Sequence, residues 1–271
     1  MTPFVSPGRR RARVEPTKLR GGHVSPVRRV GGTVRRPVGP WSAAVHSLLC
    51  HFEEVGFDAA PSFLGIDDDG REILSFVDGD AAVAPVPAGD EAVAALGQLL
   101  RRMHDCQAGY TPPADAVWQS VPDKRRAGEV ICHNDIFWPN VICRDGLPHA
   151  LIDWDLAAPG RRIDDLASAA YFWSPLRPDK GAREWGLPTT RRPQRLRLLC
   201  DAYGLTANER GELLDAIVGY CDRAYVMHRT WGALERRPGW YEMWKSGSGK
   251  LIHDNLAYIE KHRTILEREL E

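Results

Sequence analysis

The sequence predicts an α+β fold of two lobes, with a small N-terminal lobe rich in β-strands and a large, mainly helical C-terminal lobe. The chain has 271 residues and is 43% hydrophobic, so it can bury a sizeable core and is long for one compact body. Short strand-like runs with turn signals fill residues 18–79. After residue 167, apolar residues recur at helical spacing. We therefore divide the chain into a basic tail over 1–17, expected to be disordered, and lobes over 18–79 and 80–271.

The N-terminal lobe is expected to be a small sheet with one helix. Gly-Gly pairs at 21–22 and 31–32 separate two strand-like pieces, 23–30 and 33–38. Residues 41–55 place apolar side chains at helical spacing, and Gly56 follows as a stop signal. A second hairpin, with strands over 62–66 and 71–77, surrounds an Asp-Asp-Asp-Gly turn.

The C-terminal lobe is expected to begin with a helix over 90–104, capped by Asp90. At its end, His104 is interpreted as a satisfied structural histidine rather than a catalytic group. Thr206 and Glu209 have the spacing of a capping box. Three apolar runs of strand length, and then four helices, complete the lobe: strands over 130–132, 141–143 and 150–152, and helices over 165–173, 191–203, 207–234 and 251–270.

The charge is unevenly distributed, although the net charge is zero. Residues 1–36 carry ten basic side chains and one acidic side chain, which leaves −9 on the rest. A basic arm can bind nucleic acid or membranes, but we interpret this one as a tail followed by phosphate-facing strands. The acidic remainder suits a cationic ligand. No apolar run approaches the roughly 20 residues that cross a bilayer, and the six cysteines show no close pairing, so we expect a cytoplasmic protein with reduced thiols and neither nucleic-acid nor membrane partners.

A polar loop between the first two C-lobe strands carries the candidate catalytic residues. It holds His133, Asp135 and Asn140, and the following hairpin returns Asp153 to the same end of the sheet. Phosphoryl transfer needs one carboxylate to take the proton of the acceptor hydroxyl, and separate oxygen ligands for Mg²⁺. Asp135 fits the first role, while Asn140 and Asp153 fit the second. His133 is expected to brace the loop by hydrogen bonding, and a simple hairpin with a polar turn is the alternative.

The chain resembles the aminoglycoside phosphotransferase and choline kinase superfamily, whose fold is similar to that of protein kinases. The resemblance lies in His133-Asn134-Asp135 through Asn140, Ile152-Asp153-Trp154-Asp155, Pro159-Gly160 and Asp165-Leu166-Ala167. It implies a protein-kinase-like two-lobed fold, a catalytic base at Asp135, magnesium ligands at Asn140 and Asp153, and a structural role for Asp165. Within this superfamily, the sequence is most similar to a bacterial branch that is often labelled only as phosphotransferase, and sometimes as trifolitoxin-immunity-like.

The resemblance implies that the N-terminal lobe binds ATP or GTP. Ser25, in the Gly-rich turn region, is a candidate phosphate contact. The hinge between the lobes is expected near 75–79, where backbone groups would face the nucleotide base. We assign the base contacts to Ser75, Phe76 and Val77.

Arg36 lies at the strand position where the superfamily has a phosphate-binding lysine. Period-2 alternation places Arg36 on the same face as Val34 and puts Arg35 on the opposite face. Arginine grips phosphate with a planar fork, so it does not simply replace an ammonium group. The glutamate that partners the lysine in the superfamily would fall near Val45 or His46, and neither residue is acidic.

The function implied is transfer of the γ-phosphoryl group of ATP or GTP, with Mg²⁺, to a hydroxyl of a small molecule. An amine-bearing metabolite or antibiotic is the leading acceptor class. The alternative is a catalytically weak or silent nucleotide-binding or immunity protein of the same fold, which the arginine and the missing helix glutamate favour. A protein kinase is disfavoured because Trp154-Asp155 follows Asp153 in place of Phe-Gly. The oligomeric state is not indicated. Several tryptophans are candidates for stacking on the acceptor: Trp173, Trp185, Trp231, Trp240 and Trp244.

Overall fold

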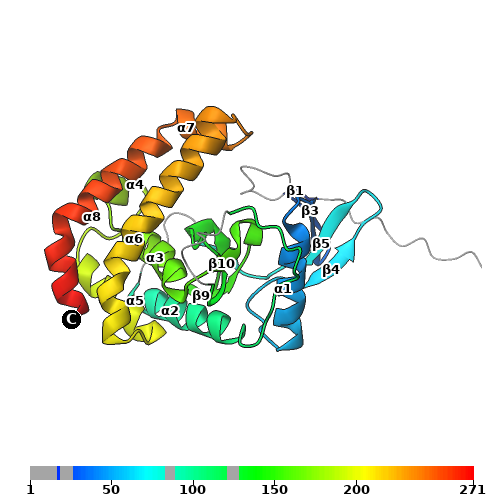
Figure 1. The fold of residues 1–271 in the computed structure, drawn as a ribbon, viewed down its shortest axis with the longest axis horizontal. Coiled ribbons are helices and arrows are strands. Elements are labelled where there is room, and N and C mark those ends of the chain that lie inside the picture. The colour runs from blue at the N-terminus through cyan, green and yellow to red at the C-terminus, as the bar shows by residue number, and fades with distance from the viewer. Residues whose placement is uncertain (1–16, 19–26, 83–88, 121–127) are drawn as a thin grey trace, which may run out of the picture.

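The computed structural model describes residues 17–18, 27–82, 89–120 and 128–271. It has the two predicted lobes: a sheet and one helix lie at one end of the molecule, and the long helices lie at the other (Figure 1). Of the tail expected over 1–17, only Thr17 is described, and it belongs to a strand. Ser25 lies outside the described residues.

The N-terminal lobe is an antiparallel five-stranded sheet with the order β1-β2-β3-β5-β4. Gly31 takes the positive φ of the β2–β3 turn. Helix α1 buries an apolar stripe that includes Leu48 and Phe52 and ends before Gly56, as predicted. The elements are β1 (Thr17–Lys18), β2 (Arg28–Val30), β3 (Thr33–Pro37), α1 (Ser42–Glu54), β4 (Phe63–Ile66) and β5 (Arg71–Ser75).

The C-terminal lobe places two small sheets against a helical bundle. The strands are β6 (Asp80–Ala81), β7 (Val130–Cys132), β8 (Val141–Arg144), β9 (Leu147–Leu151) and β10 (Ala158–Gly160), paired as β6-β8-β9 and β10-β7. The helices are α2 (Asp90–Asp105), α3 (Arg162–Trp173), α4 (Asp179–Glu184), α5 (Arg192–Tyr203), α6 (Ala207–Met227), α7 (Trp240–Lys245) and α8 (Ser248–Leu270). Helix α2 packs on α5, α3 packs on α6, and α6 packs on α8. Figure 1 shows α6 and α8 running beside each other with α7 at one end.

Several predicted boundaries differ from the structure. The helix predicted over 207–234 ends its α-helical part at Met227 and continues as a π-helix, His228–Leu234. Gly89 rather than Asp90 is the N-cap of α2, and no side chain caps that helix. Helices α4 and α7 were not predicted. The Thr206–Glu209 capping box is confirmed.

The core lies beneath the polar loop between β7 and β8. Trp138, Trp154 and Trp173 are among the largest fully buried side chains, and they join one cluster with apolar residues of α2 and α3. The loop is therefore supported by close packing from below. Within the described ranges, no helix combines the length and apolar character needed to cross a bilayer.

Candidate active site

The polar loop is held by one buried carboxylate at the N-terminal end of α3. Asp165 is fully buried and accepts hydrogen bonds from the backbone N–H groups of His133 at 2.8 Å and Asn134 at 2.7 Å. His104 Nε2 donates to the same carboxylate at 3.2 Å. Burial raises the pKa of Asp165, but the hydrogen bond from His104 and the other polar contacts outweigh it, so the pKa is lowered. Asp165 and His104 are therefore structural braces, as expected.

Two residues of the loop and its return strand have left-handed backbone. Asn134 has φ of 64° and Asp153 has φ of 63°, a conformation that Asn and Asp tolerate better than other non-glycine residues. The Asn134 side chain donates to the Leu156 carbonyl at 3.0 Å. It thereby ties the loop to the segment that follows Asp153. This role of Asn134 was not predicted, although asparagine is a residue type that favours such a backbone conformation.

His133 braces the polar loop through hydrogen bonds. Its Nε2 donates to the Ile152 carbonyl at 3.0 Å, so its Nδ1 is free to accept from the Asp135 backbone N–H at 3.3 Å. Burial lowers the pKa of His133 and outweighs the attraction of Asp165. The imidazole is consequently neutral, and it links the loop to the strand that delivers Asp153.

Asp135 and Asn140 are brought together at the mouth of the loop. The Asn140 amide donates to Asp135 Oδ2 at 2.8 Å and to the Asp135 carbonyl at 3.2 Å. Burial of Asp135 and the negative charge of Asp153 raise the pKa of Asp135 to about 7, and the Asn140 hydrogen bond only partly opposes them. This carboxylate is therefore both fixed in direction and more basic than an ordinary aspartate.

Asp153 offers an exposed carboxylate beside this pair. Half of its side chain is exposed, and its Oδ1 accepts from Arg36 Nη1 at 3.0 Å. Carboxylate and amide oxygens are the donors that Mg²⁺ prefers. The mutual repulsion that raises the pKa of Asp135 shows that negative charge accumulates here. Asn140 and Asp153 thus fit a magnesium ion in chemistry and charge.

Arg36 lies at the centre of a cluster of three carboxylates. Its Nε donates to Glu72, its Nη1 to Asp153 and its Nη2 to Asp155. Burial lowers the pKa of Arg36, but the three carboxylates outweigh it and raise that pKa well above its usual value. The predicted face is confirmed, since Arg36 is buried, whereas Arg35 on the opposite face contacts Asp67.

Glu72 was missed by the sequence analysis. It lies directly opposite Arg36 in the β3–β5 register and is 1% exposed. His46 of α1 donates from Nε2 to its other oxygen at 2.5 Å. Burial raises the pKa of Glu72, but His46 and Arg36 together lower it. The alternation of β5 held the signal, because Glu72 shares the inward face with Leu74.

The hinge residues are only partly available for a nucleotide. The Ser75 backbone N–H donates to the Ser62 carbonyl at 2.9 Å, and the Phe76 N–H donates to the Gly32 carbonyl at 3.0 Å. Both donors are therefore used within the sheet. Val77, just after β5, packs against the core. Arg29 stacks on the Phe76 ring with its guanidinium carbon 3.6 Å from the ring centre.

Aromatic side chains extend from the catalytic loop into the helical lobe. Tyr220 of α6 bonds Ser168, and the nearby charge of Asp135, added to burial, raises its pKa. Phe172 packs between Phe137, at 5.0 Å between ring centres, and Tyr220, at 6.2 Å. Of the tryptophans considered, Trp185 joins this group and is exposed, while Trp173 and Trp240 are buried and the Trp231 ring packs on Trp240. Tyr220 was not predicted, since a lone tyrosine on a helix gives no signal.

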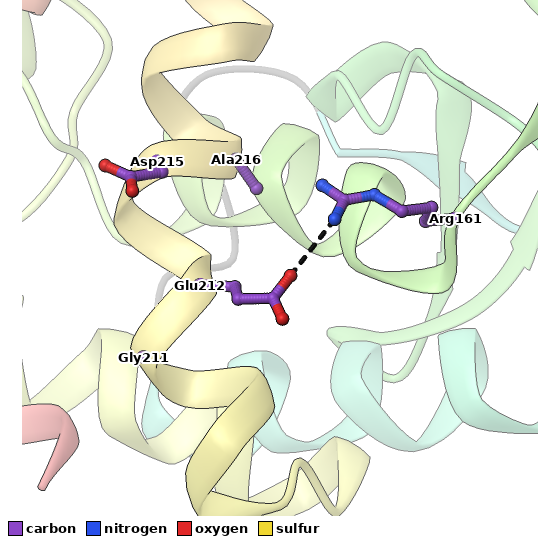
Figure 2. Close-up of a pocket in the computed structure, with 5 residues that line it drawn as sticks. All are labelled: Arg161, Gly211, Glu212, Asp215 and Ala216. Carbon is purple, nitrogen blue, oxygen red and sulfur yellow. Dashed lines mark hydrogen bonds and ion pairs between the residues drawn. The ribbon is translucent and has the colours of Figure 1, made fainter. Parts of the chain in front are cut away.

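A separate depression of about 200 Å³ lies between α6 and the start of α3 (Figure 2). Its wall includes the ion pair between Arg161 Nη1 and Glu212, 3.0 Å long, together with Asp215, Gly211 and Ala216. Figure 2 shows Arg161 and Glu212 facing each other across it, with Asp215 pointing away. None of these residues belongs to the catalytic loop or to the Arg36 cluster.

The two lobes have the protein-kinase-like fold of aminoglycoside phosphotransferases and choline kinases. Solved structures of this fold align over most of the chain. A choline/ethanolamine kinase family protein from Mesorhizobium loti is 14% identical with a TM-score of 0.59, covering 94% of this chain and 92% of its own. The GDP and kanamycin complex of APH(2")-IIia is 14% identical with a TM-score of 0.59, covering 91% of this chain and 94% of its own. An amicoumacin kinase in complex with AMP-PNP and Ca²⁺ is 13% identical with a TM-score of 0.61, covering 94% of this chain and 88% of its own.

The sequence comparisons are more specific. Residues 111–199 match the phosphotransferase enzyme family. The trifolitoxin immunity protein of Rhizobium leguminosarum bv. trifolii is 38% identical over 263 residues, which cover 93% of this chain and 97% of that protein. The chain therefore belongs to the phosphotransferase enzyme family, within which it is similar to a trifolitoxin immunity protein.

Proposed function

We propose that the protein is a Mg²⁺-dependent kinase that transfers the γ-phosphoryl group of ATP or GTP to a hydroxyl of a small molecule. The observation that carries this proposal is the geometry of Asp135, whose carboxylate is held by the Asn140 amide at 2.8 Å near Asp153; its burial and the charge of Asp153 also raise its pKa to about 7. General base catalysis is most effective when the pKa of the base lies near the operating pH. A protein that only sequesters its ligand has no need of such a group.

The described side chains support a simple division of labour during transfer. Asp135 orients the acceptor hydroxyl and takes its proton as the new oxygen–phosphorus bond forms. The 2.8 Å bond from Asn140 keeps the Asp135 carboxylate from rotating, and His133 keeps the loop backbone in place. Catalysis of this kind depends mainly on placement, because little covalent work falls on the protein.

The nucleotide side of the site is assigned to the N-terminal lobe. Asn140 and Asp153 would hold Mg²⁺, which when bound neutralises the charge of the phosphates. Arg36 is the phosphate-binding cation, and Ser25 is proposed as a further phosphate contact. Among the hinge residues, the proposal rests on Val77, since the N–H groups of Ser75 and Phe76 bond within the sheet.

The acceptor class we propose is an amine-bearing metabolite or antibiotic. The partly exposed rings of Phe172, Trp185 and Tyr220 near the catalytic loop can stack on a sugar or a cationic amine. The related folds include a complex with kanamycin and a choline/ethanolamine kinase family protein, so amine-bearing ligands are bound on this scaffold. A cytoplasmic location is proposed, where nucleotide triphosphates are available.

A second candidate function is immunity by binding, without efficient turnover. Two observations favour it: Arg36 engages Asp153, one of the metal ligands proposed, and the relative at 38% identity is named an immunity protein. In this alternative the site holds a nucleotide or a toxic molecule, and Asp135 transfers no phosphate.

A thermal-shift titration separates these functions. The wild type and Asp153→Ala are titrated with ATP and GTP, each with and without Mg²⁺, since ligands that bind the native state raise its transition temperature. We expect a Mg²⁺-dependent shift that Asp153→Ala loses and that Asp69→Ala, an exposed control on the β4–β5 turn, keeps. Phosphate transfer is then screened on amine-bearing acceptors. No shift with either nucleotide would contradict the kinase, and a shift without transfer would favour the binding protein.

A further inference from the structure

We propose that Glu72 and His46 are positioning residues that hold Arg36 for the nucleotide phosphates. Arg36 and Glu72 together take the place of the lysine–glutamate pair that the chain lacks, with the carboxylate supplied by strand β5 and only a hydrogen-bond donor, His46, supplied by helix α1. The inference rests on the proposed function, because it assigns residues to the nucleotide side of the same site.

The Arg36–Glu72 pair is fixed by the sheet itself. The two residues are cross-strand neighbours on β3 and β5, and their side chains are 10% and 1% exposed. Neighbours in register on one face are held close by the backbone ladder. Glu72 is too deeply buried to contact a ligand directly, so its contacts with other residues define its role.

His46 completes the anchor from the opposite side. Its ring stacks on Phe63, with ring centres 3.7 Å apart and planes 12° from parallel, so the direction of Nε2 is set by packing. That nitrogen donates to one oxygen of Glu72, while Arg36 Nε donates to the other. Both oxygens of the buried carboxylate are thereby satisfied, which a buried charge requires.

The anchor leaves one edge of the guanidinium for the ligand. An ammonium group can be held from any direction, but a guanidinium must be held at one edge if it is to grip phosphate with the other. Glu72 holds the Nε edge. Nη1 and Nη2 point to Asp153 and Asp155, whose side chains are 50% and 25% exposed. These outer contacts can be exchanged for phosphate oxygens, whereas the inner contact with Glu72 stays buried.

The test is a mutant cycle read by nucleotide affinity. The dissociation constants of Mg²⁺–ATP and of adenosine are measured by calorimetry for the wild type, Glu72→Gln, Arg36→Gln and the double variant. We expect Glu72→Gln to weaken Mg²⁺–ATP binding at least ~10-fold, the size of a lost charged hydrogen bond, and to leave adenosine binding within ~2-fold. In the Arg36→Gln background it should add nothing. Asp67→Asn, which removes a carboxylate of the β4–β5 turn that contacts Arg71 and Arg35 rather than Arg36, is the matched control.

A second variant moves the carboxylate from the strand to the helix. His46→Glu combined with Glu72→Gln places an acid on α1 next to position 72, which returns the lost negative charge to the cluster, and it should restore Mg²⁺–ATP affinity to within ~3-fold of wild type. If Glu72→Gln alone does not fold, this folded double variant decides the question. Unchanged affinity in Glu72→Gln, equal losses for ATP and adenosine, or no restoration would overturn the inference. A wild type that binds no nucleotide would overturn the proposed function as well.

Discussion

The two sides of the candidate site are held in different ways. On the C-terminal side, Asp165 holds the loop through backbone N–H groups, and the neutral His133 links it to the Asp153 strand. On the N-terminal side, side chains hold one another. Arg36 donates to three carboxylates, and one of them, Glu72, comes from a neighbouring strand. One side is a local hydrogen-bonded loop, and the other is a buried cluster of charges.

The difference explains how each side tolerates changes of residue type. When backbone groups do the holding, the side chains of Asp135 and Asn140 are left free for chemistry. When side chains do the holding, one ion pair can be replaced by another of different geometry, provided that every buried charge keeps a partner. On the N-terminal side we propose such a replacement, in which Arg36 and Glu72 stand where the superfamily has a lysine and a helix glutamate.

The largest expected effect comes from removing the brace of the C-terminal side. Asp165→Ala leaves two buried backbone N–H groups and His104 without their shared acceptor. Because breaking a buried polar network strands its remaining members, we expect a loss of about 3–5 kcal/mol in the free energy of unfolding. Urea denaturation measures it. Asp165→Asn, which keeps one oxygen acceptor, should lose less, and a loss below ~1 kcal/mol for Asp165→Ala would show that the loop is held by other contacts.

The next effect concerns chemistry alone. Asp135→Asn keeps the size of the side chain and an oxygen that can accept from Asn140, so the fold and Mg²⁺–nucleotide binding should be retained. Turnover should fall at least ~10²-fold, the usual contribution of a general base. The rate of phosphate transfer is measured in single-turnover assays that follow the formation of the phosphorylated acceptor. Full turnover in this variant would remove Asp135 from the role of base.

The C-terminal side could be predicted from the sequence because its parts are close along the chain. The strands β7 and β8, the loop between them and the returning Asp153 all lie within 130–153, and each start was predicted to the residue or within three. A turn and alternating apolar runs fix such a unit locally. By contrast, the alternation of β5 turns Glu72 inward, but its partner Arg36 lies 36 positions away in sequence, and no local pattern specifies that pairing.

The helical lobe shows a second limit. Apolar periodicity predicted one helix to residue 234, but the backbone changes to a π-helix from His228. A tertiary contact falls within this segment: a Cβ on Gly232 would lie 2.7 Å from the Trp240 carbonyl oxygen, so α7 approaches at the glycine. Periodicity alone does not distinguish the two helix types over two turns.

A smaller effect links Asp135 to stability through pH. Its pKa in the folded protein is about 7, above the ordinary value of 3.8. Between these values the unfolded chain loses the proton while the folded protein keeps it, so the wild type loses stability as pH rises from 4 to 7. The Asp135→Asn variant has no titrating carboxyl at this position, so it lacks this pH-dependent loss of stability. Its stability relative to wild type should therefore increase over this window, by up to about 4 kcal/mol before solvent screening reduces it, and stay level above it.

Urea denaturation at several pH values, with a chelator present, measures that difference. Asp69→Asn serves as the control, since its carboxylate is exposed. A difference that shrinks as pH rises would mean that Asp135 is stabilised in its charged form, contrary to its burial next to Asp153.

The smallest effect is expected at the surface ion pair of Arg161 and Glu212, whose side chains are 28% and 62% exposed (Figure 2). Solvent screens such pairs, so Glu212→Gln should change the free energy of unfolding by less than ~0.5 kcal/mol. The Arg36–Glu72 pair differs in its burial, since its side chains are only 10% and 1% exposed, so we expect a clear contrast with Glu72→Gln. Both variants are compared by urea denaturation and by Mg²⁺–ATP affinity. If Glu212→Gln weakened nucleotide binding as much as Glu72→Gln, the result would contradict a specific role of the Arg36 cluster in binding the nucleotide phosphates.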